Sequence, residues 1–130
     1  MQKTTLILVA LSGMLAVALG AFGAHGLKNV LTPDQMAIWE KGIQYQFYHT
    51  FPMLVLAFYP KINIKGSFIR AIWFFLAGIL LFSGSLYIIA VKDLIGLSNI
   101  NYIGIITPIG GVSFILGWLS ILWGALRERV

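Results

Sequence analysis

The stretch "AIWFFLAGILLFSGSLYIIAV", residues 71–91, decides the fold of this chain, because it contains no Asp, Glu, Lys or Arg. A transmembrane helix needs about 20 consecutive, mainly apolar residues. Because the bilayer core offers no water to the backbone, a segment that crosses it singly must pair its own N–H and C=O groups, as a helix does. Residues 71–91 are therefore predicted to form a transmembrane helix.

Three further segments, residues 4–27, 42–60 and 94–126, also lack acidic and basic side chains. The whole chain is 59% hydrophobic and 10% charged, whereas a soluble domain carries about 25% charged residues. We therefore predict an all-α membrane protein with a single domain, residues 1–130, folded as a compact bundle. Its four transmembrane helices are expected at about residues 4–25, 36–59, 69–91 and 103–126.

The first segment also has features of a signal peptide, because Lys3 precedes an apolar run that ends in "ALGAFGA". That run covers residues 4–24, and the apolar region of a signal peptide has only about 7–15 residues. A retained helix is therefore expected, and Gly26 is predicted to end it in the left-handed conformation that favours glycine.

The net charge of +5 comes from basic residues that stand singly near the ends of the predicted spans. This placement favours membrane topology over nucleic-acid binding. Six basic residues fall on the side of the two termini and three on the other side, which predicts cytoplasmic termini. The six are Lys3, Lys61, Lys65, Arg70, Arg127 and Arg129, and the three are Lys28, Lys41 and Lys92.

The second helix has a distinctive start in "TPDQ", residues 32–35. Thr32 is predicted as the N-cap, with Pro33 at the first helical position and Gln35 completing a capping box. Met36, Trp39 and Ile43 follow at helical spacing, and they predict an amphipathic outer segment with Trp39 at the level of the lipid headgroups. Pro52 lies inside the span, where a kink is expected.

Small residues recur at helical spacing and predict close helix contacts, because helices in lipid associate through small side chains. The alternatives left open are packing within one chain and contacts between copies in a homo-oligomer. The first span contributes Gly13, Ala16, Gly20 and Ala24, the third contributes Gly84, and the fourth contributes Gly110, Ser113, Gly117, Ser120 and Gly124.

Polar residues gather towards the extracytoplasmic ends of the predicted helices, most densely in "YQFYH", residues 45–49. One interpretation is an interfacial belt in which His49 bonds to a neighbouring helix, since polar groups in a membrane usually have partners. The other is a shared polar pocket that opens outwards. The candidate pocket residues are His25, Tyr45, Gln46, Tyr48, His49, Ser83, Ser85, Tyr87 and Thr107.

Several chemistries are disfavoured by composition. The chain has no cysteine and two histidines, whereas a metal site usually needs three or four protein ligands. No carboxylate stands within the charge-free segments to orient a Ser–His pair, and the glycine pattern of residues 20–26 matches no phosphate-binding loop. We therefore predict a protein with no enzymatic activity, no metal and no cofactor.

Four stretches together resemble a known family: "GAFGAHGL", "WEKGIQYQFYH", "LFSGSLY" and "TPIGG" followed by "GW". In order and spacing they are similar to the signatures of the domain of unknown function 423 family. The resemblance implies a small four-span protein of the bacterial inner membrane, and it supplies no biochemical activity. The matched positions are Gly20, Gly23, His25, Gly26, Trp39, Tyr45, Gln46, Tyr48, His49, Ser83, Gly84, Ser85, Tyr87, Thr107, Pro108, Gly110 and Gly111.

The sequence thus favours a non-enzymatic, oligomeric membrane module that binds a lipid or amphipathic molecule at its extracytoplasmic end. Its expected partners are membrane lipids and further copies of the chain, and nucleic acid is not expected. The alternative is a small channel or transporter that uses a polar pocket around His49, whose imidazole can change charge near neutral pH.

Overall fold

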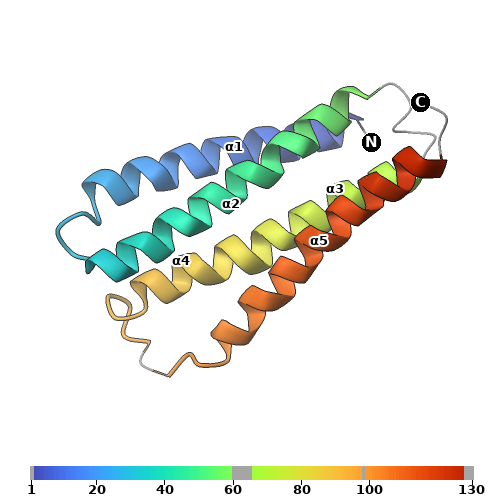
Figure 1. The fold of residues 1–130 in the computed structure, drawn as a ribbon. Coiled ribbons are helices and arrows are strands. Elements are labelled where there is room, and N and C mark those ends of the chain that lie inside the picture. Colours follow the sequence, from blue (N-terminus) through green and yellow to red (C-terminus); the bar gives the residue numbers. More distant parts are fainter. Residues whose placement is uncertain (1, 60–65, 98, 128–130) are drawn as a thin grey trace.

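The computed structural model describes residues 2–59, 66–97 and 99–127, and within these ranges it is helical, with no strand (Figure 1). Four long helices lie side by side, and successive helices run in opposite directions. This confirms the predicted all-helical class. The helices are α1 (Gln2–His25), α2 (Pro33–Phe58), a third rod made of α3 (Gly66–Gly78), the π-helical turn η1 (Ile79–Ser83) and α4 (Gly84–Val91), and finally α5 (Ile103–Arg127).

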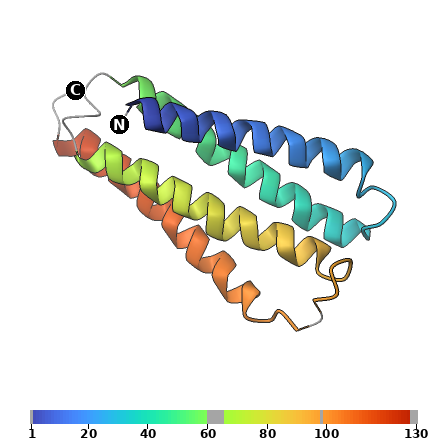
Figure 2. The ribbon, with the colours of Figure 1, turned by 180° about the vertical axis from the view of Figure 1, so that it is seen from behind.

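The two ends of the bundle are named here for the segments that lie there. The start of α1 and the end of α5 lie together at one end, here called the terminal end (Figure 1). The turns that join α1 to α2 and α4 to α5 lie at the opposite end, here called the loop end. Seen from behind, the same pairing persists, with α1 beside α2 and the third rod beside α5 (Figure 2).

Three helical stretches are long and apolar enough to cross a bilayer: Gln2–His25, Gly66–Val91 and Ile103–Arg127. The helix α2 is not among them, and it carries Asp34, Glu40 and Lys41 in its first turns. The assignment of α2 as a fourth span therefore stays a prediction. So does the orientation of the termini, since Lys61, Lys65 and Arg129 lie outside the described residues.

The third rod and α5 are joined by a repeating contact of phenylalanine against glycine. Phe75 packs on Gly117, where an added Cβ would lie 2.5 Å from the ring, and Phe68 packs on Gly124, where it would lie 2.9 Å away. At Gly110 an added Cβ would meet the backbone of Phe82. The three glycines on α5 and the three phenylalanines on the third rod each recur every seven residues. The antiparallel helices therefore bring each phenylalanine beside a glycine.

Two serines lie on or beside the same face of α5. Ser113 is buried, and its hydroxyl donates to the Phe74 carbonyl at 2.7 Å, which adds a hydrogen bond between the helices. Ser120 is half-buried and donates to the Leu116 carbonyl of its own helix at 2.7 Å. The structure therefore places the five predicted small residues of the fourth helix on the side that faces the third rod.

The contact face of α1 differs from the predicted one. Its buried residues are Thr5, Val9, Ser12, Ala16 and Gly23. A Cβ added at Gly13, Gly20 or Gly84 would meet nothing within 4 Å, and Ala24 is exposed. The expectation that Gly13, Gly20, Ala24 and Gly84 allow close packing within the chain is therefore wrong, and of the four residues predicted on α1 only Ala16 is buried. Side chains that form hydrogen bonds hold α1 against α2 instead.

The start of α2 forms as predicted, because Thr32 caps it and closes a capping box with Gln35. The stripe that follows faces the bundle, so Trp39 is buried and is not exposed to lipid headgroups, while the amphipathic outer segment stays a prediction. Trp39 is only 4% exposed, and its indole Nε1–H donates to the Leu19 carbonyl at 3.0 Å. Met36 and Ile43 pack against the same buried cluster as Trp39. Trp39 is thus a core residue between α1, α2 and α4.

Two further predictions concern the end of α1 at Gly26 and the kink at Pro52. The glycine with positive φ among the described residues is Gly96 (φ 70°), not Gly26, so the predicted left-handed cap on α1 is wrong. Gly96 follows α4, where the Leu97 N–H donates to the Lys92 carbonyl at 2.9 Å. The helix α2 continues through Pro52, and the kink there stays a prediction.

Candidate functional site

Gln46 is the centre of a buried network that joins α1, α2 and α4. Its side chain is 1% exposed, its Nε2 donates to the Ser12 carbonyl at 2.8 Å, and its Oε1 accepts from the Tyr87 hydroxyl at 2.7 Å. The Thr50 hydroxyl donates to the Gln46 carbonyl at 2.7 Å. Because Thr50 has only one hydroxyl proton, Ser12 must donate in the 2.7 Å bond between the Ser12 and Thr50 hydroxyls. The network is therefore engaged in holding the helices together.

A second polar contact links α4 to α5. The Ser85 hydroxyl donates to the Phe82 carbonyl at 2.9 Å and lies 2.6 Å from the Thr107 hydroxyl. Since Ser85 has already used its proton, Thr107 is the donor in that pair. Both hydroxyls therefore have partners within the chain, and they act between helices.

His49 differs from these residues, because one of its ring nitrogens has no partner in the described part of the chain. The side chain is 6% exposed, and its ring stacks on Phe114 with the centroids 3.5 Å apart and the planes inclined by 8°. Nδ1 lies 2.7 Å from the Tyr45 carbonyl. A carbonyl only accepts, so Nδ1 carries a proton, and in the neutral ring Nε2 is left as an acceptor.

A groove of about 460 Å³ lies between α2 and α5 beside this histidine. Three of its lining residues, Val112, Ile115 and Trp118, are at least 49% exposed, so the groove opens sideways towards the surroundings of the bundle. Among the residues that the structure describes, no charged side chain lines it. The lining residues are Tyr45, His49, Phe82, Pro108, Gly111, Val112, Phe114, Ile115 and Trp118.

The groove has aromatic walls and two polar side chains, since Tyr45 brings its hydroxyl and His49 its ring nitrogens. Tyr45 stacks on Phe82 with centroids 4.5 Å apart, and Phe82 lies 5.6 Å from Phe114. On α5 the lining runs from Pro108 to Trp118, which is about 15 Å along a helix axis. Such a groove can hold an apolar molecule and accept one hydrogen bond from it.

The structure does not bring the nine predicted pocket residues together. Tyr45 and His49 line the groove, whereas Tyr48 does not and is 58% exposed, with its ring centroid 5.9 Å from that of Tyr45. Gln46 and Tyr87 belong to the buried network, and Ser85 and Thr107 to the link between α4 and α5. Ser83 is fully buried in η1, and its hydroxyl has no hydrogen-bond partner within residues 2–59, 66–97 and 99–127.

His25 lies apart from Tyr45 and His49. It is exposed at the end of α1, two residues after Gly23, which packs against Trp39. His49 stands ten residues beyond Trp39 on α2, which is about 15 Å along the helix axis. The contact between Gly23 and Trp39 therefore sets the level of His25 at the loop end, well away from the groove.

Sequence reasoning did not single out the aromatic wall of the groove, Phe82, Phe114 and Trp118. One available signal is the spacing of Phe114 and Trp118, four residues apart and hence on one helix face. A further signal is that Pro108 and Gly111 precede them on the same helix. In the described ranges no three His, Asp or Glu side chains lie close enough to hold a metal ion.

Comparison with known proteins identifies the family that this chain resembles. Residues 19–111 match the family model described as "Protein of unknown function (DUF423)". The chain is 44% identical over 127 residues to the UPF0382 membrane protein YwdK of Bacillus subtilis, covering 97% of this chain and 98% of the relative. No solved structure matches the chain.

Two relatives from other bacteria extend the similarity over the whole chain. The UPF0382 inner membrane protein YgdD of Escherichia coli is 42% identical over 128 residues, covering 98% of this chain and 93% of the relative. A UPF0382 membrane protein of Haemophilus influenzae is 41% identical over 130 residues, covering 99% and 98%. These relatives are named as membrane proteins, and their names state no activity.

Proposed function

Because this chain belongs to the DUF423 family of membrane proteins of unknown function, we propose that it is a four-span membrane protein that binds one uncharged, lipid-like molecule in the groove between α2 and α5. The observation that carries the proposal is His49, which lines an aromatic groove and whose Nε2 has no hydrogen-bond partner among the described residues. A polar group within a membrane is costly unless it has a partner. A bound molecule would supply that partner.

The proposal needs α2 to cross the membrane beside the other three helices. The segment from residue 42 to residue 59 contains no charged side chain. Its outward side chains are large and apolar, with Phe51 60%, Val55 70% and Phe58 63% exposed. An apolar face of this kind is stable against acyl chains, and α2 packs along α1, which is itself long and apolar enough to span.

The chemistry of the groove defines the class of ligand. Aromatic walls favour an apolar body, and a volume of about 460 Å³ lies within the range of about 300–1,000 Å³ typical of small-molecule sites. Since Nε2 accepts, the ligand must offer an O–H or N–H donor. Since no lining residue is charged, a neutral headgroup such as an alcohol fits better than a phosphate. The lateral opening gives access from the bilayer.

The polar contacts support a binding role over the channel alternative. A channel needs a continuous polar path through the bundle, whereas the hydroxyl and amide groups of Gln46, Thr50 and Ser85 are used in bonds within and between helices. Phe75 and Met53 are fully buried in the apolar core. The groove is complete within one chain, so the proposal does not require a homo-oligomer. It retains the cytoplasmic termini predicted from the basic residues.

The test uses a pair of photoactivatable probes on the full chain in detergent micelles. One probe is a long-chain alcohol that carries a diazirine, and the other is its methyl ether, which cannot donate a hydrogen bond. We expect the alcohol to label residues 108–118 and to do so about five- to tenfold more efficiently than the ether, given a hydrogen bond worth about 1 kcal/mol. Mass spectrometry of the peptides maps the label.

Two variants separate the groove from general contact with detergent. His49→Phe keeps a ring for the stack on Phe114 and removes the acceptor, so the preference for the alcohol should disappear. Tyr48→Phe removes a hydroxyl from an exposed neighbour and should change nothing. Equal labelling by both probes in the unmodified protein, or label spread evenly over exposed positions such as Val55 and Leu126, would overturn the proposal.

A further inference from the structure

The two ends of the bundle differ in their balance of charge. At the loop end the basic residues Lys28, Lys41 and Lys92 are accompanied by three carboxylates, Asp34, Glu40 and Asp93. At the terminal end the described charged side chains are Lys3, Arg70 and Arg127, and all three are basic. Over the full sequence, the segments that belong to this end have six basic side chains and one acidic one, Glu128, so the terminal end is positive on balance, as a surface that meets anions is.

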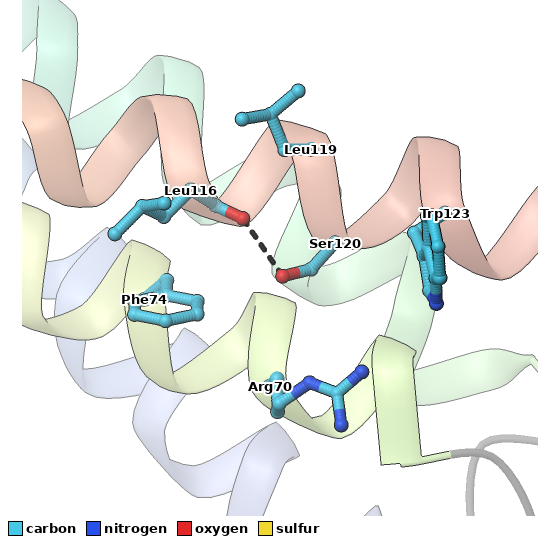
Figure 3. A pocket seen from close by; sticks show the side chains of 6 residues that line it. All are labelled: Arg70, Phe74, Leu116, Leu119, Ser120 and Trp123. Atoms are coloured by element: carbon cyan, nitrogen blue, oxygen red, sulfur yellow. Dashed lines mark hydrogen bonds between the residues drawn. The ribbon is translucent and has the colours of Figure 1, made fainter.

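Arg70 lines a cleft of about 320 Å³ between α3 and α5 at this end. Arg70 and Phe74 extend from α3 towards Ser120 and Trp123 on α5 (Figure 3). The cleft combines one cationic group with an apolar floor and walls. Its lining residues are Arg70, Phe74, Leu116, Leu119, Ser120 and Trp123.

Most of the hydrogen-bonding capacity of Arg70 is unused within the described chain. Its one hydrogen bond there runs from an Nη atom to the Ser67 hydroxyl at 3.2 Å. A guanidinium has five N–H donors in a planar fork, a shape that fits a phosphate with two parallel bonds. Arg70 is exposed, so it can meet an anion without a burial penalty.

A second guanidinium lies next to the cleft. Arg127 stands over the ring of Trp123, 4.4 Å from the ring centroid, which is a cation–π contact. Trp123 itself lines the cleft. One indole therefore separates the cleft of Arg70 from the charge of Arg127, and both arginines lie near the ends of their helices.

We propose that this cleft binds an anionic phospholipid, with Arg70 holding the phosphate and with Phe74, Leu116 and Leu119 in contact with an acyl chain. A basic pocket between transmembrane helices near the membrane surface is a known way to hold acidic lipid headgroups. The apolar lining argues for a lipid over free phosphate, which would make no use of three apolar side chains. This site is independent of the groove at His49, and its proposed ligand is anionic, whereas that of the groove is uncharged.

Native mass spectrometry of the full chain in detergent tests the site with three probes given separately: phosphatidylglycerol, phosphatidylcholine and inorganic phosphate. We expect phosphatidylglycerol to bind about fivefold more tightly than phosphatidylcholine, because both lipids carry a phosphate but the choline cation cancels the net charge that attracts Arg70. Inorganic phosphate should not form a lasting adduct and should not displace the bound lipid.

Matched variants locate the binding. Arg70→Gln should weaken phosphatidylglycerol binding about tenfold, and Arg70→Lys should restore part of it, because lysine keeps the charge and loses the fork. Lys92→Gln removes the same charge at the loop end and should leave binding unchanged. His49→Phe should also leave it unchanged, which separates this site from the groove.

Three results would overturn the proposal. Equal binding of phosphatidylglycerol and phosphatidylcholine would show that the headgroup is not recognised. A loss of binding in Lys92→Gln as large as in Arg70→Gln would show attraction to total charge. Displacement of the lipid by inorganic phosphate at matched concentration would assign the cleft to phosphate alone. The thermal unfolding midpoint of each variant in detergent, expected to be unchanged, shows that the fold is intact.

Discussion

The contact between the third rod and α5 and the contact between α1 and α2 join helices of similar length by different means. In the first, glycines seven residues apart receive phenylalanine rings, as Gly117 receives Phe75. In the second, hydrogen bonds from Gln46 and Trp39 reach backbone carbonyls of α1. Both contacts bury residues at helical spacing, since α1 buries Thr5, Val9, Ser12, Ala16 and Gly23, so the difference lies in the hydrogen-bonding side chains that α2 contributes. The two contacts should therefore respond differently to substitution.

The largest effect is expected for Gly110→Ala in the contact between the third rod and α5. An added Cβ would meet the backbone of Phe82, which cannot rotate away as a side chain can. Overpacking of this kind costs about 1–3 kcal/mol, and we expect the upper end, about 3 kcal/mol. The measurement is unfolding by sodium dodecyl sulfate in mixed micelles, followed by tryptophan fluorescence.

Gly104→Ala on the same helix is the control for that substitution. Nothing lies within 4 Å of a Cβ added at Gly104. Alanine is a better helix former than glycine, so this variant should be as stable as the original or more stable by up to about 1 kcal/mol. Equal destabilisation by both variants would contradict the backbone contact at Gly110.

The next largest effect is expected for Gln46→Leu in the contact of α1 with α2. The change removes the bond to the Ser12 carbonyl and the bond from the Tyr87 hydroxyl. Interhelical hydrogen bonds in membranes are worth about 0.6 kcal/mol on average, and the buried groups that lose a partner add to this. We expect a loss of about 2 kcal/mol in the same unfolding measurement.

Tyr87→Phe shows whether the loss comes from the network. Alone it removes one hydrogen bond and should cost about 1 kcal/mol. Combined with Gln46→Leu it should add little, since its partner is already gone. Full additivity of the two changes would mean that they do not act on one contact.

A pair of glycines on α1 tests which of its faces is packed. Gly23→Ala would bring a Cβ to 2.6 Å from the Trp39 indole nitrogen, and the ring would have to move from its bond to the Leu19 carbonyl. We expect a loss of about 1–2 kcal/mol. Gly20→Ala enters open space and should be neutral or slightly stabilising. The reverse order would restore the face predicted from the sequence.

The fold was predictable because it follows from one strong constraint. A charge-free run such as residues 71–91 has few alternatives to a membrane helix, and the spacing of Gly110, Gly117 and Gly124 marks a packing face directly. Trp39 was misassigned because an indole near a helix start serves equally well as an interfacial anchor or as a core donor. What decides between them is the position of the Leu19 carbonyl, which the sequence of α2 does not contain.

The groove was only partly predictable for a related reason. Tyr45 and His49 could be selected as polar groups in a span. Phe114 and Trp118 could not, because large apolar side chains are also what a helix turns towards lipid. Their role depends on the register of α5 against α2. His25 was grouped with His49 because the first predicted span ends, and the second begins, at the same membrane surface. The contact of Gly23 with Trp39 sets the real separation along the helices.

The smallest effect is expected where the two contacts meet, at Ser83. This residue is fully buried in η1, a π-helical turn that packs against both α2 and α5, and its hydroxyl has no partner. Burying an unpaired hydroxyl costs free energy, so Ser83→Ala should leave stability unchanged or raise it by up to about 1 kcal/mol.

Ser113→Ala is the matched change, because Ser113 is also buried and donates to the Phe74 carbonyl at 2.7 Å. It should cost about 1 kcal/mol. If Ser83→Ala proved as costly as Ser113→Ala, the hydroxyl would have a partner such as a buried water, and the π-helical turn would then be a polar site between the two halves of the bundle.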